Sequence, residues 1–436
     1  MDVRTYLLDK KEDIKSIDVK ERLANIKENK NFIISVIGPR RAGKTFFLYY
    51  FIKNVRKLRD EDYLFVNFED YVEIEDPLKL PLIHQELYGR LPQYIFFDEV
   101  QALNKWEKVI YTLYEKRKYF IFITGSSSKL LSKEIATQLR GRTISIKIYP
   151  FSFKEVFKLK GIQQKKYYSS YEEAEIRSIV NEYIEKGLFP DIVLNNVLPR
   201  AFYREYLDLV VYRDIIERYG VKNRYVLEFL IKSIISSFSS QFSVNKVFNT
   251  LKSRGIKVAK KTLYNFQKIL EDIQLTFFLR KITVLTDISL RKLELTTPKV
   301  YLIDNGLYRY TVGRRNPEKL LENAVFLELV KEGYEPNNNI FYWRSRQEDE
   351  VDFVIVENDN VKQLIQVTYE LVNENFKREV SALQKASKVL KCKNLTIVTW
   401  DQEDLIKING NQIHVIPFWK WVLREYSEEL SLNNIS

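Results

Sequence analysis

The sequence predicts an α/β fold that begins with a doubly wound parallel sheet. The apolar run at residues 31–37 leads directly into a glycine-rich loop, which is followed by a helical pattern. A second apolar run, residues 94–100, ends in two acids, and further strand-like runs alternate with helical segments. Strands that alternate with helices form a parallel sheet covered on both faces, which binds its ligand at the carboxyl ends of the strands.

Composition is that of a folded protein from a reducing compartment. The chain has 436 residues, of which 45% are apolar and 29% charged, enough for two to four domains. Cys392 is the only cysteine, so no intrachain disulfide can form, and the two distant histidines disfavour a Cys/His zinc site. The N-terminus is charged throughout, and no apolar run reaches the roughly 18 residues of a membrane helix. We therefore expect a cytoplasmic protein without a membrane partner.

The net charge is +12, from 70 lysines and arginines against 58 acids. A surplus of this size favours an anionic partner such as nucleic acid. A surface charge that keeps the protein soluble, without any partner, explains the same surplus equally well.

The loop "GPRRAGKT" matches the phosphate-binding pattern G-x-x-x-x-G-K-[ST] between a strand and a helix. Its two glycines let the backbone amides point into one concavity at a helix N-terminus, where an anion is stabilised. Lys44 is expected to reach the β- and γ-phosphates of ATP, and Thr45 to hold Mg²⁺. The expected nucleotide contacts are Gly38, Pro39, Arg40, Arg41, Ala42, Gly43, Lys44 and Thr45.

The acids that end the strand "YIFFDEV" complete the predicted site. Asp98 is expected to bind the Mg²⁺ shell, and Glu99 to polarise the attacking water. The alternative is that both acids cap the next helix, which is less compatible with a phosphate-binding loop earlier in the chain.

Two more runs contribute candidate residues. "YFIFITGSSS" (119–128) reads as a strand, and Thr124 and Ser126 near its end are candidates to sense the γ-phosphate; a plain strand-to-helix turn is the alternative. "QLRGRT" (138–143) precedes a last strand at 145–148. Arg142, ahead of Arg140, is a candidate arginine finger, acting in its own chain or on a neighbouring subunit. The alternative there is a solvated basic turn.

Together these motifs resemble the prokaryotic, largely archaeal, AAA-superfamily ATPases with an uncharacterised C-terminal region. The resemblance covers nearly the whole chain and rests on "GPRRAGKT", "YIFFDEVQALNKWEKVI", "FITGSSSKLL", "LRGRT" and "PFSFKEV". It implies a sheet of order 5-1-4-3-2 and Glu99 as the catalytic glutamate. We expect an N-terminal helical segment at 1–30, the P-loop NTPase (AAA-type) core at 31–158 and a helical lid at 159–225.

Residues 226–315 read as helices around a turn at "SRGIKV", followed by strands, which predicts a winged helix. In the helix that begins near Lys260, the core positions are expected to be Leu263, Phe266, Ile269 and Leu270. The outward residues Lys260, Lys261, Tyr264, Asn265 and Lys268 would then be free to lie in a DNA groove, with Lys260, Lys261, Asn265 and Lys268 as the candidate contacts. A winged helix that only packs against protein is the alternative.

Residues 316–436 resemble the PD-(D/E)XK nuclease core. Glu322 matches its helix glutamate and Asp352 its strand aspartate, but Gln366 and Thr368 stand where Glu-X-Lys belongs. Glutamine brings no charge to hold Mg²⁺, and threonine cannot replace a lysine that balances transition-state charge. Glu370 is expected on the same strand face, but it supplies no cation. We therefore expect a small α/β nuclease-like domain that is inactive.

The function predicted is Mg²⁺-dependent ATP hydrolysis coupled to engagement of nucleic acid, preferably DNA, by the C-terminal half. One alternative is an ATP-dependent switch that binds a protein partner. Another is an ATP-gated nuclease, which Gln366 and Thr368 disfavour. The sequence leaves open whether the chain forms a homo-oligomer.

Overall fold

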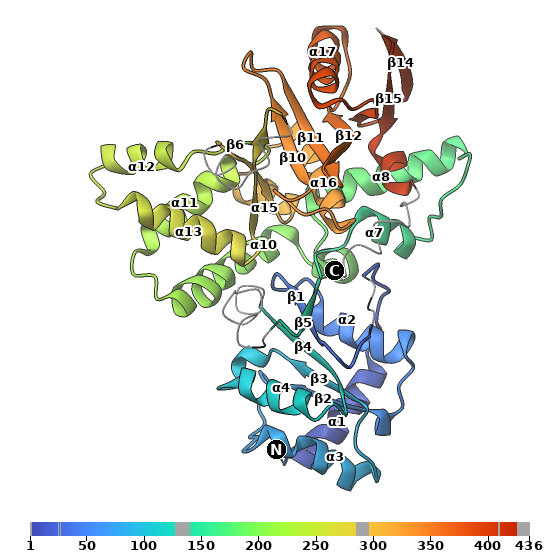
Figure 1. The fold of residues 1–436 in the computed structure, drawn as a ribbon, viewed down its shortest axis with the longest axis vertical. Helices are drawn as coiled ribbons and strands as arrows, with labels where there is room; N and C mark the ends of the chain where they lie inside the picture. Colours follow the sequence, from blue (N-terminus) through green and yellow to red (C-terminus); the bar gives the residue numbers. More distant parts are fainter. Residues whose placement is uncertain are drawn as a thin grey trace. The chain divides into compact units, whose positions relative to one another are not determined.

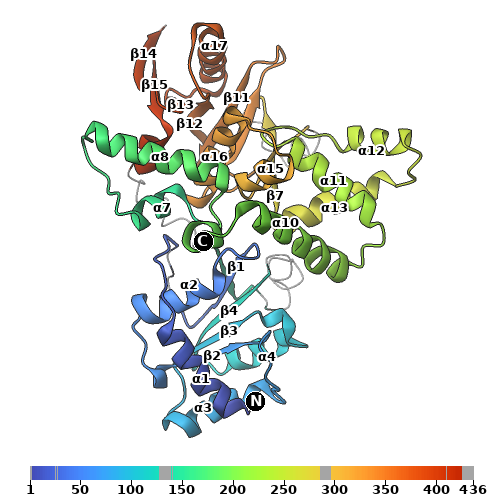
Figure 2. The ribbon, with the colours of Figure 1, turned by 180° about the vertical axis from the view of Figure 1, so that it is seen from behind.

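The computed structural model of the chain describes residues 2–24, 26, 28–126, 139, 141–284, 296–408 and 410–424. Its contacts divide the chain into two compact units (Figures 1 and 2). The first contains residues 1–150 with 272–274, and the second contains residues 151–271 with 275–436.

The first unit is built on a five-stranded parallel sheet. Its strands are β1 (Ile33–Gly38), β2 (Tyr63–Asn67), β3 (Tyr94–Asp98), β4 (Phe120–Ser126) and β5 (Thr143–Lys147). They lie in the order β2-β3-β4-β1-β5, and every neighbouring pair is parallel. This confirms the predicted order 5-1-4-3-2, read from the other edge.

Helices cover both faces of this sheet, because alternate residues of each buried strand point to opposite sides. Ile33 and Ile37 of β1 join one core cluster, whereas Ile34 and Val36 join the other. The helices are α1 (Val3–Ser16), α2 (Lys44–Tyr50, continued by a π-helical turn at Phe51–Val55), α3 (Leu80–Tyr88) and α4 (Trp106–Glu115), with 3₁₀ turns at Asp60–Asp62, Pro77–Lys79 and Val100–Ala102. Because α1 contributes Leu7 to one cluster and Ile14 to the other, the N-terminal segment is part of the core.

The second unit begins with helices in the region predicted as a lid. They are α7 (Phe153–Leu159), α8 (Ser170–Lys186), α9 (Pro190–Asn195), α10 (Pro199–Leu209) and a π-helical segment at Val210–Glu217. Helix α8 begins with a capping box formed by Ser169 and Glu172, and it ends at Gly187, which takes a φ of 89°.

The next part has the element order of a winged helix. It contains α11 (Arg224–Ser236), β6 (Ser240–Gln241), α12 (Val244–Ser253), α13 (Lys260–Asp272), β7 (Thr276–Leu279) and β9 (Lys299–Leu302). The three strands form an antiparallel sheet of order β6-β9-β7. On α13, Leu263, Phe266 and Leu270 are buried as predicted.

The C-terminal part forms a seven-stranded sheet of order β14-β15-β13-β12-β11-β10-β8. Its strands are β8 (Lys281–Ile282), β10 (Ile340–Arg344), β11 (Glu350–Glu357), β12 (Asn360–Val367), β13 (Leu395–Thr399), β14 (Asp404–Ile408) and β15 (Asn411–Pro417). The accompanying helices are α15 (Asn305–Thr311), α16 (Pro317–Lys331), α17 (Asn373–Leu390) and α18 (Phe418–Leu423).

Strand β8 connects the region from α11 to β9 to this larger sheet. It lies in the chain between β7 and β9, yet it pairs in parallel with β10 at Tyr342 and Trp343. Strands from the two sides of the predicted boundary between residues 315 and 316, β8 and β10, therefore pair with each other. The division of the second unit into lid, winged helix and nuclease-like domain stays a prediction.

Among the helices that the structure describes, none combines the length and the apolar character that crossing a bilayer would require.

Gly187 gives a test of this packing. A Cβ atom there would overlap the Tyr203 hydroxyl and the Asp304 carboxylate, whereas Gly161 has a similar φ of 77° and nothing within 4 Å. Both alanine variants place a side chain on a backbone with positive φ, but Gly187 also has a ψ of 174°, in a region almost exclusive to glycine, and only Gly187→Ala must displace buried side chains. We expect Gly187→Ala to lower the free energy of unfolding by about 1–3 kcal/mol more than Gly161→Ala. Equal losses in urea denaturation would contradict this.

Candidate functional site

The phosphate-binding loop connects β1 to α2. Gly43 precedes α2 with a φ of 91°, and Arg41 also has a positive φ, of 59°. A Cβ atom at Gly38 would overlap the carbonyl oxygen of Ile148, which explains why only glycine fits there. The loop therefore takes the sharply bent course that the sequence pattern predicts.

Lys44 lies inside this loop. Its Nζ donates to the carbonyl oxygens of Gly38 and Pro39, both at 3.2 Å, and the residue is only 6% exposed. The loop thus already holds the cation that a bound phosphate requires.

The Asp98 side chain bonds residues from several elements at the carboxyl edge of the sheet. Its Oδ2 accepts hydrogen bonds from Thr45 Oγ1 at 2.8 Å and from Asn67 Nδ2 at 3.0 Å, and its Oδ1 accepts one from Thr124. The P-loop helix, β2, β3 and β4 each supply one of these four residues. Asp98 therefore holds the carboxyl edge of the sheet together.

The Asp98 carboxylate is fully buried, and among the described residues its hydrogen-bond donors are all neutral. Burial and the neighbouring Glu99 raise the pKa of Asp98 to about 6. A buried carboxylate beside a P-loop threonine, without a bonded cation, is a donor set that fits Mg²⁺. ATP and Mg²⁺ thus suit the residues present here.

Glu99 follows in a left-handed conformation with a φ of 51°. This geometry costs a non-glycine residue roughly 1–2 kcal/mol and is enriched at functional sites. Its backbone N–H donates to Thr124 Oγ1 at 3.0 Å, and its carboxylate accepts from the Gln101 side chain. The Glu99 side chain makes no capping hydrogen bond to the following turn, which disfavours the cap interpretation.

Other predicted residues of this site lie apart from it or beyond the described part. In β4, Ser126 pairs with Gly38 of β1, which places its backbone beside the loop; its side chain lies outside the described residues, as do residues 127–138 and Arg140.

Arg142 requires a correction. Its carbonyl accepts from the N–H of Ile33, so it lies where β1 begins, five residues from the loop at the strand's other end. At about 3.3 Å per residue, that separation exceeds the reach of an arginine side chain. The Arg142 guanidinium instead bonds Tyr111 and Glu115. A finger acting within its own chain is therefore wrong; a finger acting on a neighbouring copy stays a prediction.

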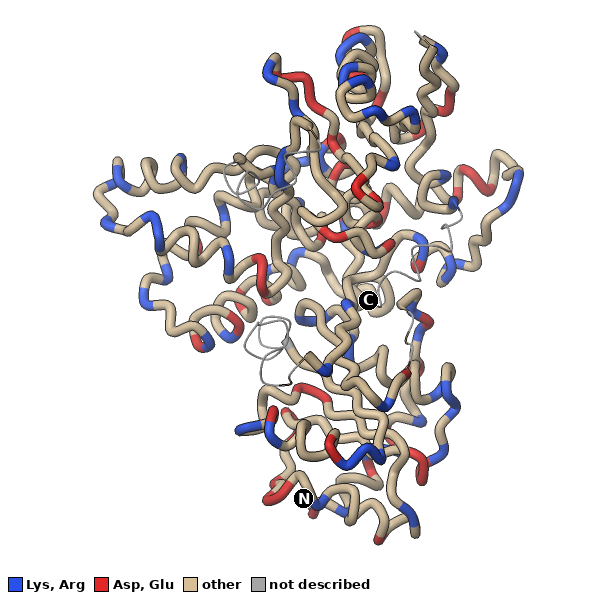
Figure 3. The backbone as a smooth tube through the Cα atoms, in the orientation of Figure 1, with Lys and Arg blue, Asp and Glu red and all other residues tan. Residues whose placement is uncertain are grey.

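The predicted nucleic-acid residues lie on the exposed side of α13. Between residues 229 and 270, a segment that we call the basic lobe, the chain has eight lysines and arginines and no acid. Figure 3 shows blue segments along α12 and α13. All eight residues are exposed: Lys232, Lys246, Lys252, Arg254, Lys257, Lys260, Lys261 and Lys268. Asn265 is exposed as well.

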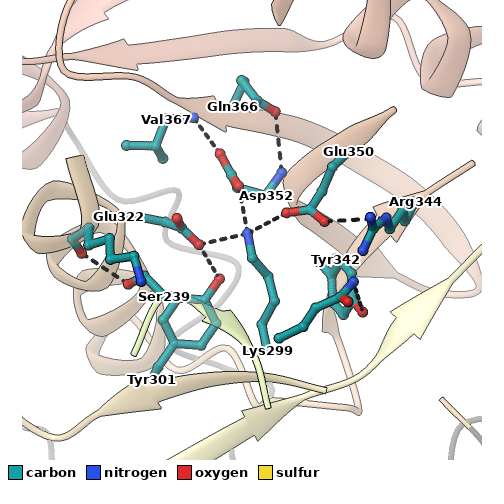
Figure 4. A network of polar contacts seen from close by, with 12 residues as sticks. Ser239, Lys299, Tyr301, Glu322, Tyr342, Arg344, Glu350, Asp352, Gln366 and Val367 are labelled. Atoms are coloured by element: carbon teal, nitrogen blue, oxygen red, sulfur yellow. Dashed lines mark hydrogen bonds and ion pairs between the residues drawn. The ribbon is translucent and has the colours of Figure 1, made fainter. Parts of the chain in front are cut away.

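The nuclease-like residues come together in the second unit (Figure 4). Glu322 lies on α16, Asp352 on β11 and Gln366 on β12. Gln366 Oε1 accepts from the Asp352 N–H at 3.3 Å, and its amide donates to Glu379 Oε2 at 2.6 Å. We call the buried cluster around Asp352 the acidic pocket; its carboxylates are Glu322, Glu350 and Asp352.

Thr368 and Glu370 lie beyond the end of β12 at Val367. The Thr368 hydroxyl donates to the Glu370 carbonyl oxygen at 3.1 Å, and the Glu370 side chain is exposed. The expectation that Glu370 shares a strand face with Gln366 is wrong, because the strand, and with it the alternation of side chains, ends first.

Lys299 is the residue that sequence reasoning missed. Its Nζ lies 2.8 Å from Glu322 Oε1, from Glu350 Oε1 and from Asp352 Oδ1, and the residue is only 3% exposed. Burial lowers its pKa, but the attraction of Asp352 and Glu322 raises that pKa well above its ordinary value. The available signal was a lysine in the otherwise apolar run "KVYLI".

Three family models match successive parts of the chain. An AAA domain matches residues 30–157, and two domains of unknown function, DUF8612 and DUF4143, match residues 177–318 and 318–421. An uncharacterized protein of Methanocaldococcus jannaschii is 37% identical over 433 residues, which cover 96% of this chain and 94% of that protein. An uncharacterized protein of Haemophilus influenzae is 29% identical, covering 78% of this chain and 83% of its own.

Solved structures give weaker likenesses. The Walker-type ATPase PABY2304 of Pyrococcus abyssi matches with a TM-score of 0.39 and 15% identity, covering 68% of this chain and 99% of that one. The ORC1 protein of Aeropyrum pernix in complex with DNA matches with a TM-score of 0.29 and 10% identity, covering 71% of this chain and 91% of that one.

The raised pKa of Asp98 predicts a conflict between stability and binding. Because its folded pKa of about 6 exceeds the unfolded value of 3.8, Asp98 contributes stability at low pH that is lost as pH rises through 6. At pH 8 without nucleotide, Asp98→Asn should therefore raise the free energy of unfolding by about 1–3 kcal/mol, and should do much less at pH 5. Denaturation at both pH values measures this. A variant that is less stable than wild type at pH 8 would contradict it.

Proposed function

The chain belongs to the family of its Methanocaldococcus jannaschii relative, a family of AAA-type P-loop proteins, and on this basis we propose that it binds ATP with Mg²⁺ and hydrolyses it. The observation that carries the proposal is the 2.8 Å hydrogen bond from Thr45 to Asp98. It joins the helix that follows the phosphate-binding loop to the end of β3, which lies beyond β4 in the sheet, and this is the geometry a shared Mg²⁺ requires.

Each residue then has a defined task. Lys44 would exchange the loop carbonyls for phosphate oxygens, and Thr45 and Asp98 would hold Mg²⁺, which supplies positive charge to the phosphates when bound. Glu99 accepts a proton from the attacking water, and its strained backbone orients it for this role. Thr124 fixes the position of Glu99 relative to Asp98, because its hydroxyl donates to the Asp98 carboxylate and accepts from the Glu99 backbone N–H.

We further propose that the ATP state is coupled to nucleic acid held by the second unit. The basic lobe supports this, because an acid-free segment of 42 residues presents its eight cations to solvent. Cations at the start of α13 suit phosphate contacts beside a groove. DNA is the preferred partner, since a winged-helix arrangement presents such a helix to a duplex.

Replacing Glu99 separates binding from hydrolysis. We expect Glu99→Gln to bind ATP as wild type does but to lower its turnover by about 10²-fold or more, because the general base is lost while Asp98 and Thr45 remain. Lys44→Ala is the matched control, which should lose binding as well. Wild-type turnover by Glu99→Gln in a phosphate-release assay would exclude Glu99 as the base.

The basic lobe predicts a change in the salt dependence of DNA binding. Lys260→Ala/Lys261→Ala should weaken duplex binding and flatten the plot of log affinity against log salt by about 0.9 per lost phosphate contact. The control is Lys116→Ala/Lys118→Ala, which removes the same charge from exposed lysines of the first unit. Titrations at several salt concentrations measure both. Equal slopes for the two double variants would remove α13 from the interface.

A further inference from the structure

The acidic pocket joins three elements that lie apart in the sequence. Glu322 comes from α16, Glu350 and Asp352 from β11, and Lys299 from β9 (Figure 4). The nuclease-like domain is predicted at residues 316–436, so the lysine comes from outside it, from the part predicted as a winged helix. The structure thereby connects two regions that the sequence treats as separate.

Lys299 is the common partner of the three carboxylates. Its Nζ donates a hydrogen bond to Asp352 Oδ1 at 2.8 Å and forms ion pairs with Glu322 and Glu350 at the same distance. Glu322 Oε1 also accepts from the Tyr301 hydroxyl at 2.7 Å, and Asp352 Oδ2 from the Val367 N–H at 2.9 Å. Each carboxylate points one oxygen at the same position in space, as ligands around a single cation do.

Charge explains why that position must be filled. Three carboxylates converge there, and a second cation, Arg344, is 3.9 Å from Glu350. Burial raises the pKa of Glu322 to about 7 even though Lys299 acts to lower it. Converging buried carboxylates without a central cation would strongly destabilise the fold.

Most of the pocket is buried. The side chains of Lys299, Asp352 and Glu322 are only 4%, 8% and 13% exposed, whereas Glu350, at 29%, lies where the pocket reaches solvent. Within the described part of the chain, no group of three or more histidines, cysteines or acids is arranged to hold a metal ion. Gln366, at the position of a third ligand, is bonded to Glu379. A phosphodiester would have to displace these contacts before it reached Asp352.

We propose that the Lys299 ammonium is the permanent cation of the acidic pocket, in the place where a divalent metal ion would otherwise bind. The ion pairs of Lys299 then hold β9 to α16 and β11, and the pocket does not hydrolyse nucleic acid. Lys299 is a positioning residue here, and the wild-type pocket takes no metal. Removing its side chain exposes a site for a hard divalent cation with oxygen ligands.

The test counts bound Mn²⁺ by electron paramagnetic resonance on the full chain without nucleotide. Wild type and Asp352→Asn should bind the same number of ions. Lys299→Ala should bind one more ion per chain than wild type, and Lys299→Ala/Asp352→Asn should lose it again. The control is Lys319→Ala, which removes a half-buried lysine whose charge also acts on Glu322 and should leave the count unchanged.

Stability provides a second readout. Without metal, Lys299→Ala should lower the melting temperature by roughly 10 °C, because the carboxylates lose their counterion. Mn²⁺ should then raise the melting temperature of Lys299→Ala by several degrees, and that of wild type and Lys299→Ala/Asp352→Asn much less.

Two results would overturn the proposal. If wild type binds an Mn²⁺ that Asp352→Asn loses, or cuts DNA or RNA with Mn²⁺ until Asp352 is replaced, metal displaces Lys299 and the pocket is a nuclease site. If folded Lys299→Ala gains no ion, the carboxylates do not form a cation site. Should Lys299→Ala fail to fold, the comparison of wild type with Asp352→Asn still decides whether the native pocket excludes metal.

Discussion

The buried carboxylate of Asp98 is the constraint on which the first unit depends. It collects hydrogen bonds from Thr45, Asn67 and Thr124, so the phosphate-binding loop and neighbouring strand ends are positioned by one group. No cation among the described residues bonds to it, and burial raises its pKa to about 6. The same atoms that organise the sheet edge therefore remain short of positive charge, which a bound cation would supply.

The acidic pocket of the second unit also places negative charge in the interior, but there a residue of the chain compensates it. Its carboxylates also lie in a poorly hydrated interior, but the chain supplies the compensating charge itself, through Lys299. An internal ammonium cannot diffuse away, so the compensation is permanent and has a structural effect. It also joins β9 to α16 and β11, as β8 joins the same region to β10. Two independent connections thus hold the region from α11 to β9 to the elements of the larger sheet.

The first site was predictable because its residues are set by local chemistry. Lys44 and Thr45 are adjacent in one loop, and Asp98 and Glu99 end one strand, so each pair is visible within a few residues of sequence. Arg142 was misread because a motif shows that an arginine exists but not at which end of the sheet it lies. Its hydrogen bond to Ile33 decides that, through the register between β5 and β1.

The sequence by itself determined the parallel sheet, the phosphate-binding loop and most of the buried face of α13. Each follows from periodicity or from a contiguous motif, which the chain carries whatever its distant parts do, whereas the strand order was expected from the family resemblance. Only the tertiary structure decided that Lys299 lies among Glu322, Glu350 and Asp352, because these residues come from three elements brought together by long-range packing. It also decided that Glu370 is exposed, since the end of β12 depends on its pairing with β11 and β13 and not on the residues of β12 alone.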